Sequence, residues 1–276
     1  MKMTSNKFIL SKPEFDFFFN PKGNIKSLVC GNLESGIFKS YRSFEFDKSG
    51  SIKSEIGYQS GWSAYPPGTT PPLPIQYLRR YTYKNGQLEV VTEEDKNSNE
   101  MLKSYEFNYQ NELLMKITET KKINSGYSPQ YTIFEYDLNG LPLTEKIYIS
   151  SIGNSKSYIT SEIMRNANNK IIKILNSNYA EHKGKLISKQ EISTYDIEYE
   201  DKRIRKIFST PNHDKTYTIT AELLSSNYNM IETIKYPNEF PDKQKVKFEY
   251  DKDSQNIEKK KTIYKNREVT ELYNYE

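Results

Sequence analysis

The stretch Phe134-Glu135-Tyr136-Asp137-Leu138-Asn139-Gly140-Leu141 decides the fold. Two aromatic residues alternate with a polar one, then Asp, Asn and Gly follow, and an aliphatic run returns. Alternation with a period of two indicates a half-buried strand. Asp, Asn and Gly accept the backbone angles that a tight turn requires. The stretch therefore predicts a β-hairpin.

Similar stretches recur along the chain. The second aromatic of each clear copy lies at position 19, 46, 83, 107, 136, 199 or 250, and weaker copies turn near residues 166–169 and 226–229. A repeat period of 20–50 residues is typical of repeat arrays. About nine hairpins, and so roughly sixteen to eighteen strands, are expected. The predicted fold is all-β, an antiparallel meander of about nine β-hairpin repeats in a curved or wound sheet, in one domain over residues 1–276.

The composition agrees with this fold and argues against a nucleic-acid partner. The chain has 23 Tyr and 13 Phe, which a disordered chain would lack. Its 40 basic and 36 acidic residues are intermixed, whereas a nucleic-acid-binding protein concentrates basic charge on one face. The run Lys259-Lys260-Lys261 is interpreted as a solvated strand that points to both faces. We expect no nucleic-acid partner.

The sequence carries no classical export or membrane signal. Residues 1–20 lack the basic segment and apolar run of a signal peptide, and no stretch approaches the ~20 apolar residues of a membrane helix. Cys30 is the single cysteine, so no internal disulfide can form. A cytoplasmic protein without a membrane partner, monomeric or homodimeric, is predicted. A signal peptide trimmed from the chain would leave the same picture.

Hairpin geometry separates two kinds of loop. Short Asp/Asn/Gly turns should line one edge of the sheet, and the longer connectors between hairpins should line the other, where function usually lies. The longest connector, a Pro-rich insertion at 57–76, holds the only Trp and five of the twelve prolines. The predicted partner-binding residues are Trp62, Tyr65, Pro66, Pro67 and Leu73 in this insertion and Tyr127 in another connector. The alternative is that the insertion folds back and caps an open end of the sheet.

Two further expectations concern the strands. Each return strand should keep strict alternation, so that the sets Ile52/Ser54/Ile56, Leu113/Met115/Ile117 and Leu141/Leu143/Ile147 would each share one face. The regularly spaced aromatics should pack in the core. The rival interpretation is a stacking groove for sugars or bases, which would require exposed rings. These aromatics are Phe46, Tyr83, Phe107, Tyr136, Tyr199 and Tyr250.

The hairpin copies resemble YD repeats, the units of the RHS family, whose pattern is aromatic-x-Tyr-Asp-x-x-Gly followed by an aliphatic strand. Residues 44–52 and 134–141 carry the pattern most fully, and residues 248–251 keep Phe-Glu-Tyr-Asp without the Gly. The resemblance implies a winding antiparallel sheet. Long RHS arrays enclose a toxin cargo, but this chain is too short for such a shell and lacks the self-cleavage core region and a toxin-like tail. Small YD-like proteins resemble immunity or accessory partners of bacterial polymorphic toxins.

No catalytic constellation stands out. His182 and His213 lie 31 residues apart in polar connectors, and neither they nor Cys30 have the spacing of a metal site. The pairs Glu93/Glu94 and Asp251/Asp253 are interpreted as solvated charge at turns or strand ends. We expect no catalytic residues, metal or cofactor.

The sequence therefore predicts a non-enzymatic protein-binding module, an immunity protein that binds and neutralises a bacterial toxin. The alternative is a secreted or cell-surface RHS-like protein, structural or glycan-binding. A hydrolase ranks below both.

Overall fold

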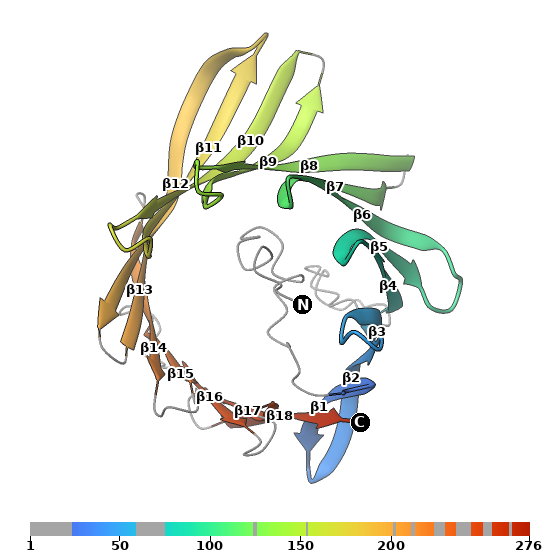
Figure 1. Cartoon of the computed structure of the whole chain (residues 1–276). Helices are drawn as coiled ribbons and strands as arrows, with labels where there is room; N and C mark the ends of the chain where they lie inside the picture. The colour runs from blue at the N-terminus through green and yellow to red at the C-terminus, as the bar shows by residue number, and fades with distance from the viewer. Residues whose placement is uncertain are drawn as a thin grey trace, which may run out of the picture.

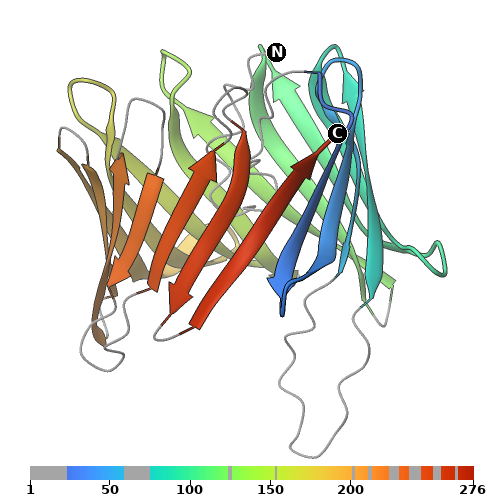
Figure 2. The same cartoon turned by 90° about the horizontal axis from the view of Figure 1, so that it is seen from below.

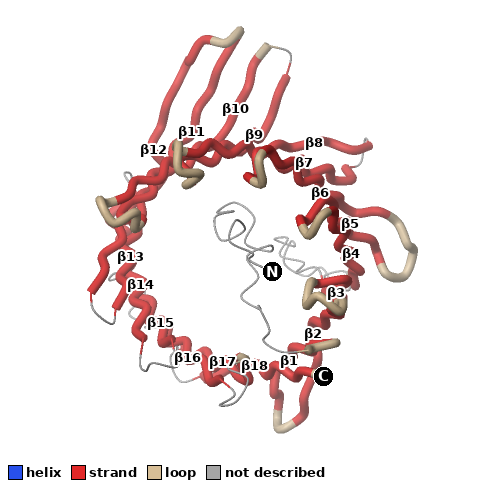
Figure 3. The backbone as a smooth tube through the Cα atoms, in the orientation of Figure 1, coloured by secondary structure: helices blue, strands red, loops and turns tan. Residues whose placement is uncertain are grey.

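The computed structural model shows an antiparallel sheet that curls into a ring (Figures 1 and 2). It describes residues 24–58, 75–123, 126–152, 154–200, 203–210, 213–223, 230–235, 244–250, 256–264 and 267–276. Within these ranges the chain consists of strands and short loops, without a helix (Figure 3). The predicted all-β antiparallel meander is confirmed.

Eighteen strands are present among the described residues. They are β1 (Ser27–Glu34), β2 (Ile37–Phe46), β3 (Ile52–Tyr58), β4 (Gln76–Lys84), β5 (Gln87–Asp95), β6 (Met101–Gln110), β7 (Leu113–Ile123), β8 (Gly126–Tyr136), β9 (Pro142–Ile152), β10 (Ser155–Arg165), β11 (Ile171–His182), β12 (Lys185–Glu200), β13 (Arg203–Thr210), β14 (His213–Leu223), β15 (Met230–Lys235), β16 (Gln244–Tyr250), β17 (Ile257–Tyr264) and β18 (Arg267–Tyr275). Each strand pairs with the next along the chain, and β1 also pairs with β18 through Leu28↔Tyr275 and Cys30↔Tyr273. The hydrogen-bonded ladder thus returns to its first strand, which removes the exposed edges that an open sheet would leave.

The connections alternate between two rims, as the hairpin geometry predicts. The turn rim carries the loops that follow the even-numbered strands, such as 47–51, 85–86, 111–112, 137–141 and 166–170. The connector rim carries those that follow the odd-numbered strands. The hairpin spacing also assigns residues 121–129, 151–156 and 176–185 to connectors, and this prediction is wrong. These residues lie largely within β7–β12, and Lys183–Gly184 alone turns β11 into β12.

Three turns share one mechanism. The Asp47 side chain accepts hydrogen bonds from the backbone N–H of Ser49 and Ser51 at 2.8 and 3.0 Å. Asp137 and Asn166 make the equivalent pairs of bonds in their own turns. The fourth position adopts positive φ in each, with Gly50 at 79° and Gly140 at 73°, where glycine is unstrained. The Asp, Asn and Gly residues of the sequence predicted these tight turns.

The return strands are not strictly alternating, so the three predicted face sets are wrong. Six hairpins carry a β-bulge close to the turn, between Glu45/Phe46, Thr82/Tyr83, Asn108/Tyr109, Glu135/Tyr136, Met164/Arg165 and Glu249/Tyr250. The bulge precedes the last residue pair in four of them and the last two pairs in β4–β5 and β6–β7. A bulge adds one residue to one strand and shifts its alternation. Residues three apart therefore share the buried face in the return strands, as Leu88 and Val91 do, and Leu114 and Ile117.

The core is a face of the sheet rather than a filled centre. Phe44, Phe46, Tyr105, Phe107 and Phe134 are buried on this face. Core packing is thus confirmed for Phe46 and Phe107.

The tyrosines at the second aromatic position are more accessible than these phenylalanines. Tyr83 is partly buried against the core, and two others form hydrogen bonds. Tyr136 is partly buried, and Tyr199 is exposed. Their hydroxyls donate to the carbonyls of Leu114 and Ile171, near the start of an earlier return strand, at 2.6 and 3.0 Å. The side chain of Tyr250 lies outside the described residues.

Candidate functional site: an inner charge network and the connector rim

The predicted partner-binding residues fall mainly outside the described structure. Residues 59–74, which include Trp62, Tyr65, Pro66, Pro67 and Leu73, are not described, and for Tyr127 only the backbone, at the start of β8, is placed. The strand ends that flank the insertion, Tyr58 of β3 and Gln76 of β4, lie on the connector rim, as Tyr127 does. Strands β4 to β7 separate the insertion from Tyr127 along the ring. The topology places both predicted regions on one rim, at some distance from each other.

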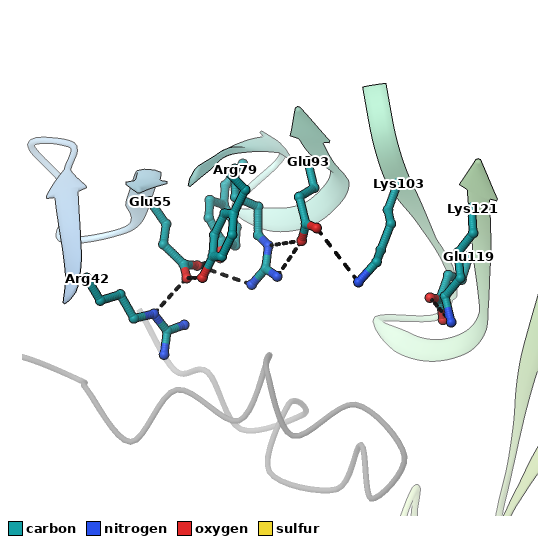
Figure 4. A network of polar contacts seen from close by, with 9 residues as sticks. Arg42, Glu55, Arg79, Glu93, Lys103, Glu119 and Lys121 are labelled. Atoms are coloured by element: carbon teal, nitrogen blue, oxygen red, sulfur yellow. Dashed lines mark hydrogen bonds and ion pairs between the residues drawn. The ribbon is translucent and has the colours of Figure 1, made fainter. Parts of the chain in front are cut away.

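A network of buried charges crosses the inner face of β2–β6 (Figure 4). Glu55 accepts a hydrogen bond from Nε of Arg42 at 2.6 Å and pairs with Arg79 at 3.3 Å. Arg79 donates two hydrogen bonds to Glu93, at 2.6 and 3.1 Å. Lys103 lies 3.7 Å from the other oxygen of Glu93. Cations and carboxylates alternate from strand to strand, so each buried charge faces an opposite one.

Tyrosines complete the hydrogen bonding of this network. The hydroxyls of Tyr77 and Tyr81 each donate to Glu55 at 2.6 Å. Across the β1–β18 junction, Tyr41 of β2 and Tyr273 of β18 both donate to Glu271, which also pairs with Lys260 at 3.1 Å. Polar side chains thus line the inner face on both sides of the junction that joins the two ends of the sheet.

Within the network, opposite charges and hydrogen bonds offset the cost of burying Glu55. Burial opposes ionisation of Glu55, but Arg79, Arg42 and the hydrogen bonds from Arg42 and Tyr77 outweigh it and hold the pKa of Glu55 below its usual value. Burial and the carboxylate of Glu55 raise the pKa of Tyr81. Glu55 and Glu93 are each engaged by cationic side chains. Such pairs cost several kcal/mol when one partner is removed.

Cys30 and His182, two other candidate reactive side chains, are a buried thiol and a hydrogen-bonded imidazole. Burial raises the pKa of the Cys30 thiol to about 12, so it stays protonated and unreactive at neutral pH. His182 is the last residue of β11, not a connector residue, and its Nδ1 lies 2.9 Å from the Ser155 hydroxyl. The side chain of His213 lies outside the described residues. Where the structure describes side chains, no three His, Cys, Asp or Glu are placed to hold a metal ion.

The connector rim exposes most of the large apolar side chains that reach solvent. Of the fourteen such side chains among the described residues, nine flank this rim: Leu33, Ile37, Tyr58, Ile75, Ile149, Leu186, Ile187, Ile192 and Val269. They fall in two groups, one from β18 to the start of β4 and one in β9 and β12. Exposed apolar surface of this kind marks interaction sites in soluble proteins when it is contiguous. The connector rim is therefore the strongest candidate binding surface.

Part of this rim stands out from the ring. Residues 149–152, 154–157 and 177–193, here named the β9–β12 extension, form the ends of four strands that lean away from the ring (Figure 1). At the base of the extension Tyr148, Tyr158 and Tyr179 form a ladder across three strands, with ring centroids 5.2 and 5.1 Å apart. The Tyr158 and Tyr179 hydroxyls donate to Glu181 and Glu162. The ladder fixes the base of the extension.

Sequence reasoning missed the charge network. Glu93, interpreted as solvated charge, is buried, and only Glu94 faces outward, toward Arg80 at 3.6 Å. One signal was available: Arg79 lies between Tyr77 and Tyr81 at the spacing that puts all three on one face. An arginine on an aromatic face needs a buried partner. The identity of that partner depends on the bulge that turns Glu55 inward.

Comparisons with known proteins give no family. No family model matches the chain, and no curated protein matches it. Among solved structures, a porin-like protein from Bacteroides uniformis is similar with a TM-score of 0.47 at 11% identity, over 93% of this chain and 98% of the other. One from Bacteroides vulgatus has a TM-score of 0.34 at 9% identity, over 91% and 98%. A TcdB2–TccC3–Cdc42 complex has a TM-score of 0.24 at 8% identity, and the match covers 85% of this chain and 17% of that one.

The described part of the chain contains no helix of the length and apolarity that crossing a bilayer requires.

Proposed function

We propose that this chain is a non-enzymatic protein-binding module, and specifically an immunity protein that binds and neutralises a bacterial toxin. The observation that carries the proposal is the gathering of exposed apolar side chains on the connector rim. Interfaces take their binding energy from a few such side chains that become buried on association. The engaged state of the inner carboxylates favours binding over catalysis.

We also propose a family for the chain. We place the chain among YD-repeat proteins of about nine hairpins. Its support is the recurrence of one bulge in six hairpins and of the Asp or Asn turn in three. The step from this resemblance to toxin neutralisation, and the cytoplasmic location that goes with it, rest on the sequence alone.

The test is affinity capture from a lysate of the source organism. The intact chain serves as bait beside two variants, one lacking residues 59–74 and one carrying Leu186→Ser and Ile187→Ser. We expect one protein to be retained by the intact chain and weakened by at least one variant. If the captured protein is a toxin, growth rescue on co-expression measures neutralisation. A blank capture with the intact chain contradicts the binding proposal.

A secreted glycan-binding role is the second candidate, because Tyr199 and part of the tyrosine ladder reach solvent. Stacking on sugars requires an open ring face. Tyr158, at the centre of the ladder, is buried, and its ring lies parallel to that of Tyr179. A panel of soluble oligosaccharides measured by calorimetry tests this role, and the protein-binding role predicts no heat of binding.

A further inference from the structure

Among the described residues, the β9–β12 extension has two strand edges that pair with no neighbouring strand. Pairing of β9 with β8 stops at Tyr148↔Tyr131, and pairing of β12 with β13 starts only at Thr194↔Ser209. Between these points β9 pairs only with β10, and β12 only with β11. The ring closes its own edges at β1–β18 but opens two new ones here.

The β12 edge is the longer of the two. It runs from Lys185 to Ser193, whereas the β9 edge spans only Ile149 to Ile152. Among the described residues, no strand pairs with the β12 backbone on the side away from β11. Such an edge is a template for an added strand, whose backbone N–H and C=O groups complete the ladder.

Side chains along this edge offer apolar contacts to an added strand. Leu186 and Ile187 are 57% and 67% exposed, and Ile192 is also exposed. Register shifts place Ile187 and Ile192 at bulges against β11. Bulges restrict the registers in which a strand can pair. The edge therefore selects its partner strand more narrowly than a flat edge would.

The charge of the edge favours an acidic partner. Lys183, Lys185 and Lys156 are exposed and form no ion pair with any described residue. Glu181 and Glu191 lie nearby and accept hydrogen bonds from the neutral hydroxyls of Tyr158 and Thr194, so they keep their charge, but the three lysines outnumber them. Lysines on an edge oppose pairing with a like-charged edge, which argues against a second copy of this chain. A lipid surface would leave the backbone groups of β12 unused.

We infer that the β12 edge from Lys185 to Ser193 binds an extended acidic segment of a partner protein by strand addition. The inference rests on the proposed protein-binding function and specifies where and how the partner docks. The partner strand pairs with the β12 backbone. Its carboxylates face Lys183 and Lys185, and its apolar residues contact Leu186 and Ile187.

The probe for this inference is a fluorescein-labelled peptide of alternating Glu and Ile. Its binding is followed by anisotropy, and its position by hydrogen exchange. Two companion peptides accompany it: one with Lys in place of Glu, and one N-methylated at alternate residues, which keeps the side chains but loses the backbone donors of one edge. We expect the acidic peptide to bind and to protect the β12 edge amides, and both companions to bind at least about tenfold more weakly.

A charge-reversal pair separates the edge from the rest of the surface. Lys183→Glu with Lys185→Glu should weaken the acidic peptide by about tenfold, equivalent to about 1.4 kcal/mol. Lys48→Glu with Lys53→Glu, exposed at the turn rim, makes the same change in net charge and should leave binding unaltered. Equal binding of the N-methylated peptide, or protection mapped elsewhere, overturns strand addition.

The remaining outcomes assign the edge to another occupant. Dimerisation that is lost on reversing Lys183 and Lys185 would assign it to a second copy. Binding to phosphatidylserine vesicles without peptide binding would assign it to a membrane surface. Both overturn the inference. The proposed function fails separately, by a blank capture with the intact chain, whereas a partner still captured by the charge-reversal variant leaves the function standing and rejects this docking site.

Discussion

Strands β2–β7, here named the wall, and the β9–β12 extension are built from the same kind of hairpin, but the wall buries its inner side chains and the extension exposes its own. In the wall, the inner face buries Phe44, Tyr105 and a full set of paired charges. In the extension, every side chain from His182 to Ile192 is exposed. The extension is mostly polar, and its apolar Leu186 and Ile187 are consecutive. The strands of the wall pair with a neighbour on each side. The outer strands of the extension, β9 and β12, continue beyond the points where β8 and β13 stop pairing with them.

This contrast shows that pairing into a strand does not by itself decide what covers the strand. The wall gains stability from burial and satisfied polar groups. The extension has few buried contacts, which is typical of segments that open locally and bind. Four experiments test the contrast, beginning with the wall.

The largest expected effect comes from two adjacent carboxylates of β5 that face opposite sides. Glu93→Ala removes the carboxylate that accepts two hydrogen bonds from the buried Arg79 guanidinium and should lower the free energy of unfolding by about 3–5 kcal/mol. Glu94→Ala removes only the exposed pair with Arg80 and should cost less than about 1 kcal/mol. Urea titration followed by circular dichroism measures both. Equal costs would mean that the inner network is not buried in solution.

A pH series sharpens the role of Glu55. Its pKa in the folded chain is lowered from the ordinary 4.5, so its contribution is fully present above pH 4.5 and is lost as the pH falls through the folded pKa. Glu55→Gln should cost about 2 kcal/mol at pH 7. The difference in unfolding free energy between the two proteins should narrow below pH 4.5. A difference that stays constant from pH 7 to pH 3 would contradict an ionised Glu55.

The sequence predicted the strands and turns because their causes are local. Asp47, Asp137 and Asn166 bind backbone amides within their own turns, and Gly140 supplies positive φ there. The alternation of aromatic and polar residues was enough to place the strands between these turns. The alternation of rims then follows from the meander itself.

The sequence did not predict the features that depend on register. Ile52 and Glu55 share the inner face only because a bulge intervenes, and nothing in Lys53 or Ser54 announces it. Glu93 is buried and Glu94 exposed, although both are acidic and adjacent. The extension depends on where β8 and β13 stop pairing with their neighbours, which is a property of four strands together.

Substitution of two glycines that have nearly the same φ tests the two regions with the same local backbone strain. Gly140 at the turn rim has φ of 73° and Gly184 at the tip of the extension has φ of 74°. A Cβ added at either meets no close contact. Replacement by Ala should strain each turn by about 1 kcal/mol. Gly140→Ala should lower global stability by that amount, whereas Gly184→Ala should mainly speed hydrogen exchange at the ends of β11 and β12.

The smallest expected effect is the most informative for function. Leu186→Ser with Ile187→Ser changes two large apolar residues, yet both are already exposed, so global stability should change by less than about 0.5 kcal/mol. The matched pair Leu114→Ser with Ile117→Ser, on the buried face of β7, should prevent folding or cost several kcal/mol. If the β12 pair proved comparably destabilising, the extension would be packed in solution and could not offer its edge. If it is silent in stability and lowers partner capture, its apolar residues serve binding, because no folding energy depends on them.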